Sequence, residues 1–282
     1  MPATSLLLGS LLALAAPAMP HAHAYREVTA HALKACVFQP GSPASAPRAA
    51  VLLLHPGGWR AGEAAWEFDE ARRFAALGLV AVAVDYRLAD GGSGPVDALA
   101  HTCAAFAWTR AHARALGVDP SRIAGYGESA GGQLVPAAGV GLCPGRTSTA
   151  RPHLMLLASP LLDTTQPIYA SLLCTPARAA AYSPLAHAGA MPPTLVVQGE
   201  ADNVAPAAAA KAFCAKASHA GGTCRLALYP KLGHLLTRDL LRQEADIDPD
   251  PQALADAGRR QRRFLAEHRL LTNDPAAKAT SP

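Results

Sequence analysis

Short runs of valine, isoleucine and leucine alternate along this chain with alanine-rich stretches of helical length. Parallel strands joined by crossover helices have this pattern, because the connecting helices bury each strand on both faces. The alternation therefore predicts an α/β fold with a mostly parallel central sheet and helices on both faces. The expected strands are 27–32 and 34–38 as an initial antiparallel pair, then 50–54, 80–84, 123–126, 154–157, 194–198 and 225–228. The expected helices are 64–77, 96–116, 130–139, 207–218 and 251–268.

The composition indicates a large buried core and argues against a nucleic-acid partner. Half of the 282 residues are hydrophobic and 16% are charged, so the chain can bury a sizeable core. The formal net charge of +4 is small and the basic residues are scattered, unlike those of a polyanion-binding surface. The one basic cluster, at 259–263, shares its segment with apolar residues and is expected on the solvent face of a terminal helix.

The N-terminal segment has features of a leader for export. The first 24 residues contain no Lys, Arg, Asp or Glu, and 6–16 form an apolar run too short to span a bilayer. Ala22-His23-Ala24 then places small residues where a signal peptidase cleaves, which predicts a signal peptide over 1–24. The alternatives are a misplaced start, since no basic residue precedes the run, and a buried helix, which Pro17 and Pro20 disfavour. The mature protein, secreted or periplasmic and outside any membrane, is then one domain over 25–271 with a disordered tail over 272–282.

Six cysteines fall within the expected mature chain: Cys36, Cys103, Cys143, Cys174, Cys214 and Cys224. An even number in an exported protein predicts disulfides, whereas in the cytosol the same residues would be reduced, buried thiols. Cys214 with Cys224 is the favoured pair, since a compact turn with two glycines separates them. Cys143 with Cys174 and Cys36 with Cys103 would complete three bridges. No Cys-x-x-Cys spacing is present, so no metal site is expected.

A candidate nucleophile lies between an expected strand and an expected helix. Gly127-Glu128-Ser129-Ala130-Gly131 follows the strand 123–126 and has the Gly-x-Ser-x-Gly arrangement. A serine on such a sharp turn is exposed by a strained backbone, and the flanking glycines remove side chains that would collide with neighbouring elements. Ser129 is therefore the predicted nucleophile, and Glu128 beside it is either a supporting group or a solvated carboxylate.

A candidate oxyanion loop, His55-Pro56-Gly57-Gly58-Trp59, follows the apolar strand 50–54. Acyl transfer develops a negative oxygen, which preorganised backbone amides stabilise. The predicted donors are the N–H groups of Gly57, Gly58 and Ala130, since a proline has no N–H to give. His55 is expected to brace this loop by hydrogen bonding rather than to act as the base, and Trp59 to form a wall of the site or to pack in the core.

The acid and the base are expected after the last two strands. A serine nucleophile needs a histidine to take its proton and a carboxylate to orient that histidine. Asp202 follows the strand 194–198 and His234 follows the last strand, so the order along the chain is Ser, Asp, His, as on an α/β-hydrolase sheet. Asp163, after an earlier strand, is the rival acid. His187 and His219 lie near turns and are expected at the surface.

Together these segments resemble the α/β-hydrolase superfamily, and within it the carboxylesterases related to hormone-sensitive lipase and to feruloyl and acetylxylan esterases. The resemblance covers nearly the whole mature chain, and Val84-Asp85-Tyr86-Arg87-Leu88 and Tyr182-Ser183-Pro184-Leu185 look like supporting segments of that branch. Two positions depart from the family pattern. Pro56 replaces the first glycine of the oxyanion loop, and Pro136 interrupts the helix that follows the nucleophile.

The resemblance implies hydrolysis of carboxylic esters through an acyl-enzyme formed on Ser129, with no metal or organic cofactor. The segment 161–188 is the only insertion of any length, so little or no cap domain is expected and the site should be open. An open site favours short acyl groups, or esters exposed on large molecules such as polysaccharides.

Two other functions stay open at this stage. A serine peptidase of the prolyl-oligopeptidase type uses the same triad, but such enzymes usually carry a large additional domain that 258 mature residues (282 minus 24) cannot hold. A non-catalytic binding protein on a hydrolase scaffold would be expected to lack part of the site, and every part is present. The oligomeric state and the natural ester are not determined by the sequence.

Overall fold

The computed structural model describes residues 19–28, 31–41, 43–90, 92–145, 151–244 and 247–271. The apolar run over 6–16 and the tail over 272–282, for which the sequence predicts a leader and disorder, lie outside the described residues. Within the described residues, no helix is both long and apolar enough to cross a membrane.

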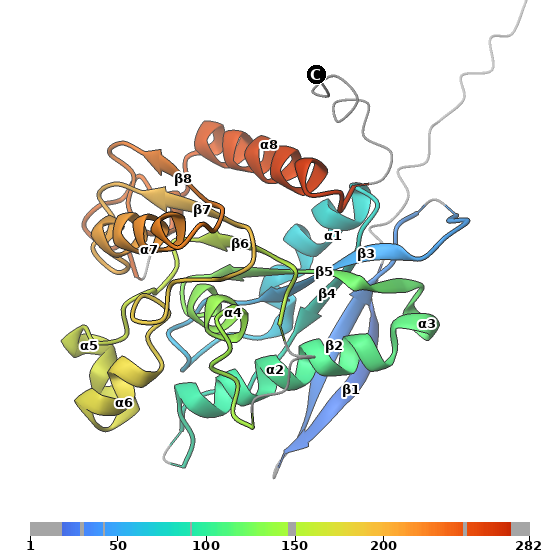
Figure 1. The fold of residues 1–282 in the computed structure, drawn as a ribbon, viewed down its shortest axis with the longest axis horizontal. Coiled ribbons are helices and arrows are strands. Elements are labelled where there is room, and N and C mark those ends of the chain that lie inside the picture. Colours follow the sequence, from blue (N-terminus) through green and yellow to red (C-terminus); the bar gives the residue numbers. More distant parts are fainter. Residues whose placement is uncertain are drawn as a thin grey trace, which may run out of the picture.

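An eight-stranded sheet forms the centre of the fold (Figure 1). Its strands are β1 (His21–Val28), β2 (His31–Phe38), β3 (Arg48–Leu54), β4 (Val80–Val84), β5 (Val118–Glu128), β6 (Leu154–Ala158), β7 (Thr194–Gly199) and β8 (Cys224–Tyr229). Their order in the sheet is β1-β2-β4-β3-β5-β6-β7-β8. The neighbours β1 and β2 are antiparallel, as are β2 and β4, and all neighbours from β4 to β8 are parallel. The mostly parallel sheet is therefore confirmed, although β1 and β5 begin earlier than the sequence predicts.

The helices agree less closely with the expected ranges. They are η1 (Ala64–Glu67), α1 (Phe68–Ala76), α2 (Pro95–Ala111), α3 (Ala113–Leu116), α4 (Gly131–Gly139), α5 (Pro167–Ala170), η3 (Ser171–Leu173), α6 (Pro176–Ala181), α7 (Ala207–His219), η4 (His234–Leu236) and α8 (Pro251–Glu267), where η marks a 3-10 helix. The expected helix over 96–116 is divided at His112, and its second part ends where Gly117 adopts a left-handed conformation. The three short helices α5, η3 and α6 between β6 and β7 were not expected, because segments of three to six residues show no helical periodicity.

Helices cover both faces of the sheet and create two separate cores. In Figure 1, α1 and α8 lie on one side of the sheet and α2 and α4 on the other. Alternate residues along each strand point to opposite faces, so Leu52 packs in the core that contains Phe106 of α2 and Phe213 of α7. Its neighbour Leu53 packs in the other core, which contains Phe264 of α8.

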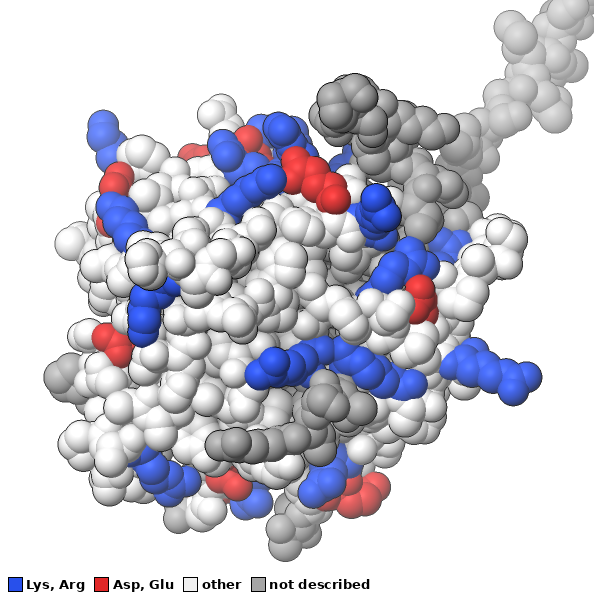
Figure 2. All heavy atoms as spheres, viewed as in Figure 1, with Lys and Arg blue, Asp and Glu red and all other residues white. Residues whose placement is uncertain are grey.

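The basic cluster at 259–263 lies on α8 as predicted. Phe264 and Leu265 are buried against the sheet, whereas Arg259 and Arg260 are exposed and pair with Asp256 within the same helix. On the face of the molecule seen in Figure 2, Lys and Arg side chains are spread apart and several have Asp or Glu beside them.

The predicted cleavage position falls inside β1. His21 to Ala24 pair with residues 34–37 of β2, so cleavage after Ala24 would remove the first four residues of this edge strand. Tyr25 stays attached to the sheet independently of them, since its hydroxyl donates a 2.5 Å hydrogen bond to the backbone oxygen of Asp85. Cleavage after Ala24 remains a prediction.

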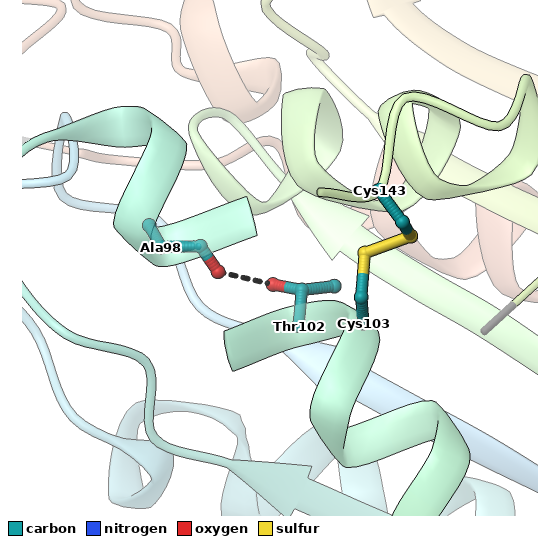
Figure 3. The surroundings of a disulfide bond; sticks show 4 residues. All are labelled: Ala98, Thr102, Cys103 and Cys143. Atoms are coloured by element: carbon teal, nitrogen blue, oxygen red, sulfur yellow. Dashed lines mark hydrogen bonds between the residues drawn. A yellow bond between two sulfur atoms is a disulfide. The ribbon is translucent and has the colours of Figure 1, made fainter. Parts of the chain in front are cut away.

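Two disulfides are present, and they confirm one of the three expected pairs. Cys214 at the end of α7 is bonded to Cys224 at the start of β8. The second bridge joins Cys103 of α2 to Cys143, just beyond α4 (Figure 3). The hydroxyl of Thr102, the residue before Cys103, donates a hydrogen bond to the backbone oxygen of Ala98 in the same helix.

The expected pairs Cys143 with Cys174 and Cys36 with Cys103 are wrong. Cys36 points into the core beneath α1, on the opposite face of the sheet from Cys103, so the sheet separates the two thiols. Cys174 is an exposed free cysteine, and Cys36 is a buried one.

Loss of the Cys103–Cys143 bridge is expected to lower the free energy of unfolding more than loss of Cys214–Cys224. The first spans 40 residues of sequence and the second 10, for which the chain-entropy relation gives about 4 and about 3 kcal/mol. Urea unfolding of the two double alanine variants, without reductant, measures both losses. Cys174→Ser is the control, expected within about 0.5 kcal/mol of the parent; a larger loss for the shorter loop would contradict the ranking.

Candidate active site

Ser129 lies on a sharp turn between β5 and α4, with a strained backbone angle φ of +49°. Space at this turn is available only because its flanking residues are glycines. A Cβ on Gly131 would lie 2.0 Å from the backbone oxygen of Leu54 in β3, and one on Gly127 would lie 2.3 Å from the oxygen of Gly131. The Gly-x-Ser-x-Gly arrangement is therefore required by the close packing of α4 against the ends of β3 and β5.

The structure brings Ser129, His234 and Asp202 together from three different loops. Nε2 of His234 lies 2.9 Å from Oγ of Ser129, and Nδ1 of the same ring lies 2.9 Å from Oδ2 of Asp202. All three residues are almost completely buried. With the ring proton on Nδ1, His234 donates to the carboxylate and presents a free lone pair to the serine hydroxyl, as a general base must.

Asp202 is held by hydrogen bonds on both carboxylate oxygens. Its Oδ1 accepts the backbone N–H groups of Val204 and Ala205 at 2.9 and 2.7 Å, and Oδ2 also accepts the side-chain amide of Gln198 at 2.9 Å. These bonds fix the direction of the carboxylate toward His234 and stabilise its negative charge.

The rival acid Asp163 does not contact His234 in this way. Its carboxylate accepts hydrogen bonds from Thr165 and Gln166 within its own turn. Partial burial opposes ionisation of Asp163, but these hydrogen bonds outweigh it and lower the pKa of the group. The geometry therefore assigns the contact with the histidine to Asp202. His187 and His219 are exposed, as expected.

The loop after β3 has a backbone conformation that only glycine adopts readily. Gly57 and Gly58 have φ angles of +114° and +60°, and a Cβ on Gly57 would lie 2.1 Å from the oxygen of Ala61. Both glycines line the same cavity as Ser129. Ala130 is the N-cap of α4, where backbone N–H groups have no partner within the helix. Gly57 and Gly58 thus line the same cavity as Ser129, and Ala130 is the next residue after it; the role of the three N–H groups as oxyanion donors remains a prediction.

His55 and Trp59 support this loop from within the protein. The ring of His55 is fully buried, its Nδ1 lies 2.7 Å from the oxygen of Pro56, and it stacks on Tyr86 with ring centroids 4.1 Å apart. Burial lowers the pKa of His55, which keeps the ring neutral. Trp59 is also fully buried and contacts Tyr169 edge to face, so of its two predicted roles the structure supports core packing.

Glu128 points into a buried polar network rather than toward solvent. Its carboxylate accepts a hydrogen bond from the hydroxyl of Tyr126. Burial raises the pKa of Glu128 to about 7, the Tyr126 hydrogen bond opposes this rise, and the negative charge of Glu70 adds to it. Glu128 is partly buried and lines a cavity, and its role as a supporting group of the site remains a prediction.

Gln243 is a structural residue of the site that the sequence did not reveal. Its side-chain oxygen accepts the backbone N–H groups of His234 and Asn203, and its nitrogen donates to the oxygen of Ala201. One buried amide thus joins the loop that carries Asp202 to the loop that carries His234. No local pattern marks such a residue, because its partners are brought near only by the fold.

A cavity of about 440 Å³ opens over Ser129 and His234. Its walls are mainly apolar, and they come from four separate parts of the chain: Trp66, Leu161, Tyr169, Leu172, Val204 and Ile247. Two of these, Tyr169 and Leu172, belong to the short helices between β6 and β7. Among the described residues, no group of three or more His, Cys, Asp or Glu side chains is placed to hold a metal ion. The serine, histidine and carboxylate at this cavity are the groups that nucleophilic acyl transfer uses.

Comparisons with known proteins agree with this fold. A family model described as alpha/beta hydrolase fold matches residues 51–173. Lipase 2 of Moraxella sp. (strain TA144) is 40% identical over 91 residues, which are 32% of this chain and 21% of that protein. Carboxylesterase NlhH of Mycobacterium tuberculosis is 41% identical over 86 residues, 30% of this chain and 26% of that protein. The matched part is thus less than a third of the length of each of these relatives.

Solved structures extend the similarity to nearly the whole chain. Esterase 2 of Thermogutta terrifontis, phosphoramylated by tabun, has a TM-score of 0.80 and 25% identity, over 92% of this chain and 98% of that one. The propionate-bound form of that esterase has a TM-score of 0.77 and 25% identity, over 90% and 96% of the two chains. The chain therefore has the α/β-hydrolase fold, and its resemblance to the carboxylesterases of that fold is confirmed.

Asp202→Asn is expected to lower kcat for an activated ester at least about a hundredfold, because the amide no longer holds the His234 tautomer that accepts the serine proton. Asp163→Asn, the matched control, is expected to change kcat very little. Release of p-nitrophenol from p-nitrophenyl butyrate measures both rates. The reverse ranking would transfer the acid role to Asp163.

Proposed function

We propose that this protein is a serine carboxylesterase that works through an acyl-enzyme intermediate. The observation that carries this proposal is the pair of 2.9 Å contacts of His234, one to Ser129 and one to Asp202. A buried histidine between a serine hydroxyl and a carboxylate is the arrangement that acyl transfer to serine requires. The match to esterases over most of the fold favours esters as substrates.

In the first half-reaction, Oγ of Ser129 attacks the ester carbonyl while Nε2 of His234 takes the hydroxyl proton. The carbonyl oxygen becomes an oxyanion, for which the N–H groups of Gly57, Gly58 and Ala130 are the proposed donors. The intermediate then collapses, the bond to the alcohol oxygen breaks, and His234 gives its proton to that oxygen.

In the second half-reaction, His234 takes a proton from water, and the resulting nucleophile attacks the acyl-enzyme. The acid leaves as the bond to Oγ breaks, and Ser129 recovers its proton from the imidazolium. Asp202 stabilises the positive charge of His234 in both halves. Every proton and bond in this sequence is handled by the chain and water, so no metal or organic cofactor is required.

The proposed substrates are short-chain esters or esters exposed on larger molecules, including those linked to polysaccharides. The cavity over Ser129 holds about 440 Å³, within the range of small-molecule sites. The neighbouring Thermogutta esterase has been solved with propionate bound, which favours a short acyl group. Peptide amides and a purely binding role are the alternatives: cleavage of peptide amides would favour the first, and no hydrolysis of any ester or amide would favour the second.

A panel of p-nitrophenyl esters from acetate to decanoate tests the proposed function. The protein is expected to prefer acetate or butyrate, and Ser129→Ala is expected to lower kcat by about three to six orders of magnitude, because it removes the nucleophile. Ser218→Ala, an exposed serine on α7, is the matched control and should leave the rates at the parental level. Equal rates for the parent and Ser129→Ala on every ester would overturn the proposal.

The protein is proposed to be exported to the periplasm or secreted after cleavage of its leader. Two disulfides support an oxidising compartment. N-terminal sequencing of the protein recovered outside the cytoplasm is expected to begin at Tyr25. A cytoplasmic protein that keeps Met1 and has the four cysteines of the two disulfides reduced would contradict export.

A further inference from the structure

The loop that carries His234 has a strained backbone. Leu235 and Leu236, the two residues after the histidine, have φ angles of +50° and +61°, in the left-handed region that is unfavourable for residues with a Cβ. Strain of this kind persists only where the surrounding structure holds the backbone in place. The loop of His234 therefore depends on restraints that come from outside its own turn.

Two buried side chains hold consecutive backbone N–H groups of this loop. The N–H of His234 donates to Oε1 of Gln243 at 2.9 Å, and the N–H of Leu235 donates to Oγ of Ser159, also at 2.9 Å. Gln243 and Ser159 are only 4% and 1% exposed, so water does not compete for these bonds. One acceptor lies on the connection to α8 and the other directly after β6. The histidine backbone is thus fixed by two separate parts of the chain.

The amide of Gln243 uses its full hydrogen-bonding capacity. Besides the N–H of the histidine, its oxygen accepts the backbone N–H of Asn203 at 3.1 Å, and its nitrogen donates to the backbone oxygens of Ala201 and Leu240 at 3.1 and 3.3 Å. An amide offers two acceptor sites and two donors, so all four are in use. Because Ala201 and Asn203 flank Asp202, the same side chain holds the loop of the acid and the loop of the base.

An amide is the side chain that these four partners require. Two of them are N–H donors and two are carbonyl oxygens. A carboxylate would face the two carbonyl oxygens without a proton to give, and an apolar side chain would leave all four groups unpaired. The fit is also close, since a Cβ on Gly233 would lie 2.6 Å from Oε1 of Gln243. The amide therefore packs directly on the backbone that leads into the catalytic histidine.

Apolar packing does not explain why Gln243 is buried. It is the one buried residue in the stretch 238–244, every residue of which the structure describes, and Leu241 in the same stretch is 94% exposed. The stretch begins at Arg238, whose backbone N–H and guanidinium both bond to Asp248. A segment placed by the hydrophobic effect would bury its leucine in preference to its amide. Hydrogen bonding to the two catalytic loops is therefore what holds Gln243 in place.

Resting on the proposed esterase function, we propose that Gln243 and Ser159 are positioning residues that act on the reaction through His234. Neither lines the cavity over Ser129. By fixing the backbone of the histidine, they keep its Nε2 within hydrogen-bond distance of the serine hydroxyl while its Nδ1 stays on Asp202. Proton transfer in either direction depends on both distances. Since His234 acts in both half-reactions, releasing its backbone slows acylation and deacylation together.

Gln243→Met tests this proposal, because methionine is of similar length and has no amide. It is expected to lower kcat for p-nitrophenyl butyrate at least about tenfold, since a displacement of about 1 Å at a catalytic group can cost about a hundredfold. KM is expected to stay within about twofold, because the two half-reactions slow by the same factor. Gln261→Met is the matched control. It removes an equally buried amide on α8 whose partner is Arg73, and it should leave kcat and KM close to the parental values.

Reaction with paraoxon separates a less reactive triad from a smaller folded fraction. Oγ of Ser129 bonds to phosphorus, His234 takes the hydroxyl proton, and p-nitrophenolate leaves in an amount equal to the number of competent sites. Gln243→Met is expected to keep the amplitude of this release and to lower its rate constant in parallel with kcat. A reduced amplitude with a parental rate constant would show a purely structural role and would overturn the proposal.

Ser159→Ala is the second variant, and it decides the outcome should Gln243→Met fail to fold. It deletes one oxygen without adding volume and removes the acceptor of the Leu235 N–H. The same fall in kcat at constant KM is expected. If the folded variants keep kcat within about twofold of the parent, or only raise KM, the positioning proposal is overturned.

The parent protein and Ser129→Ala keep this result separate from the proposed function. Hydrolysis of p-nitrophenyl butyrate that requires Ser129 would still support the esterase function, even where the positioning variants behave like the parent. Failure of the parent to hydrolyse the ester or to react with paraoxon faster than Ser129→Ala would overturn the proposed function itself.

Discussion

The close approach of α4 to strand β3 is the contact on which the site depends. Gly131 lies so near the oxygen of Leu54 that no side chain fits between them, and the strained turn at Ser129 is the direct continuation of this contact. The oxyanion loop begins at His55, immediately after Leu54. The turn that carries Ser129 packs against the carboxyl end of β3, and the proposed oxyanion loop continues from that same end. Both lie at the edge of the sheet where α/β proteins bind ligands.

Buried side-chain hydrogen bonds, rather than secondary structure, hold Asp202 and His234, the other two residues of the proposed triad. Gln243 bridges the loops of Asp202 and His234, and Gln198 holds the carboxylate from the end of β7. Each such bond contributes about 1 kcal/mol, but an unpaired buried group costs about 1–3 kcal/mol. Because Gln243 bonds to both loops, losing one partner disturbs both of them. These buried bonds make the geometry of the site more rigid than its location on loops suggests.

The Cys103–Cys143 bridge adds to this rigidity by restraining the end of α4, the helix that follows Ser129. It joins α2 to the segment just beyond α4, on the face of the sheet where both helices pack (Figure 3). The other face contributes differently, since the apolar and carboxyl-lined space between α1 and α8 lies directly behind the loop of His234. One face of the sheet thus carries both disulfide bridges, and the other has a cavity beside the loop of His234.

The sequence by itself determined the mostly parallel sheet, the identity and order of Ser129, Asp202 and His234, and the bridge between Cys214 and Cys224, because each depends on local periodicity, a local turn or a short separation along the chain. Only the tertiary structure decided the partner of Cys103, the role of Gln243 and the cavity between α1 and α8, and it also revealed the short helices between β6 and β7. These features depend on which side of the sheet a residue faces and on contacts between segments far apart in the chain. These contacts between distant segments are set by the packing of the whole chain, which no local pattern of residues encodes.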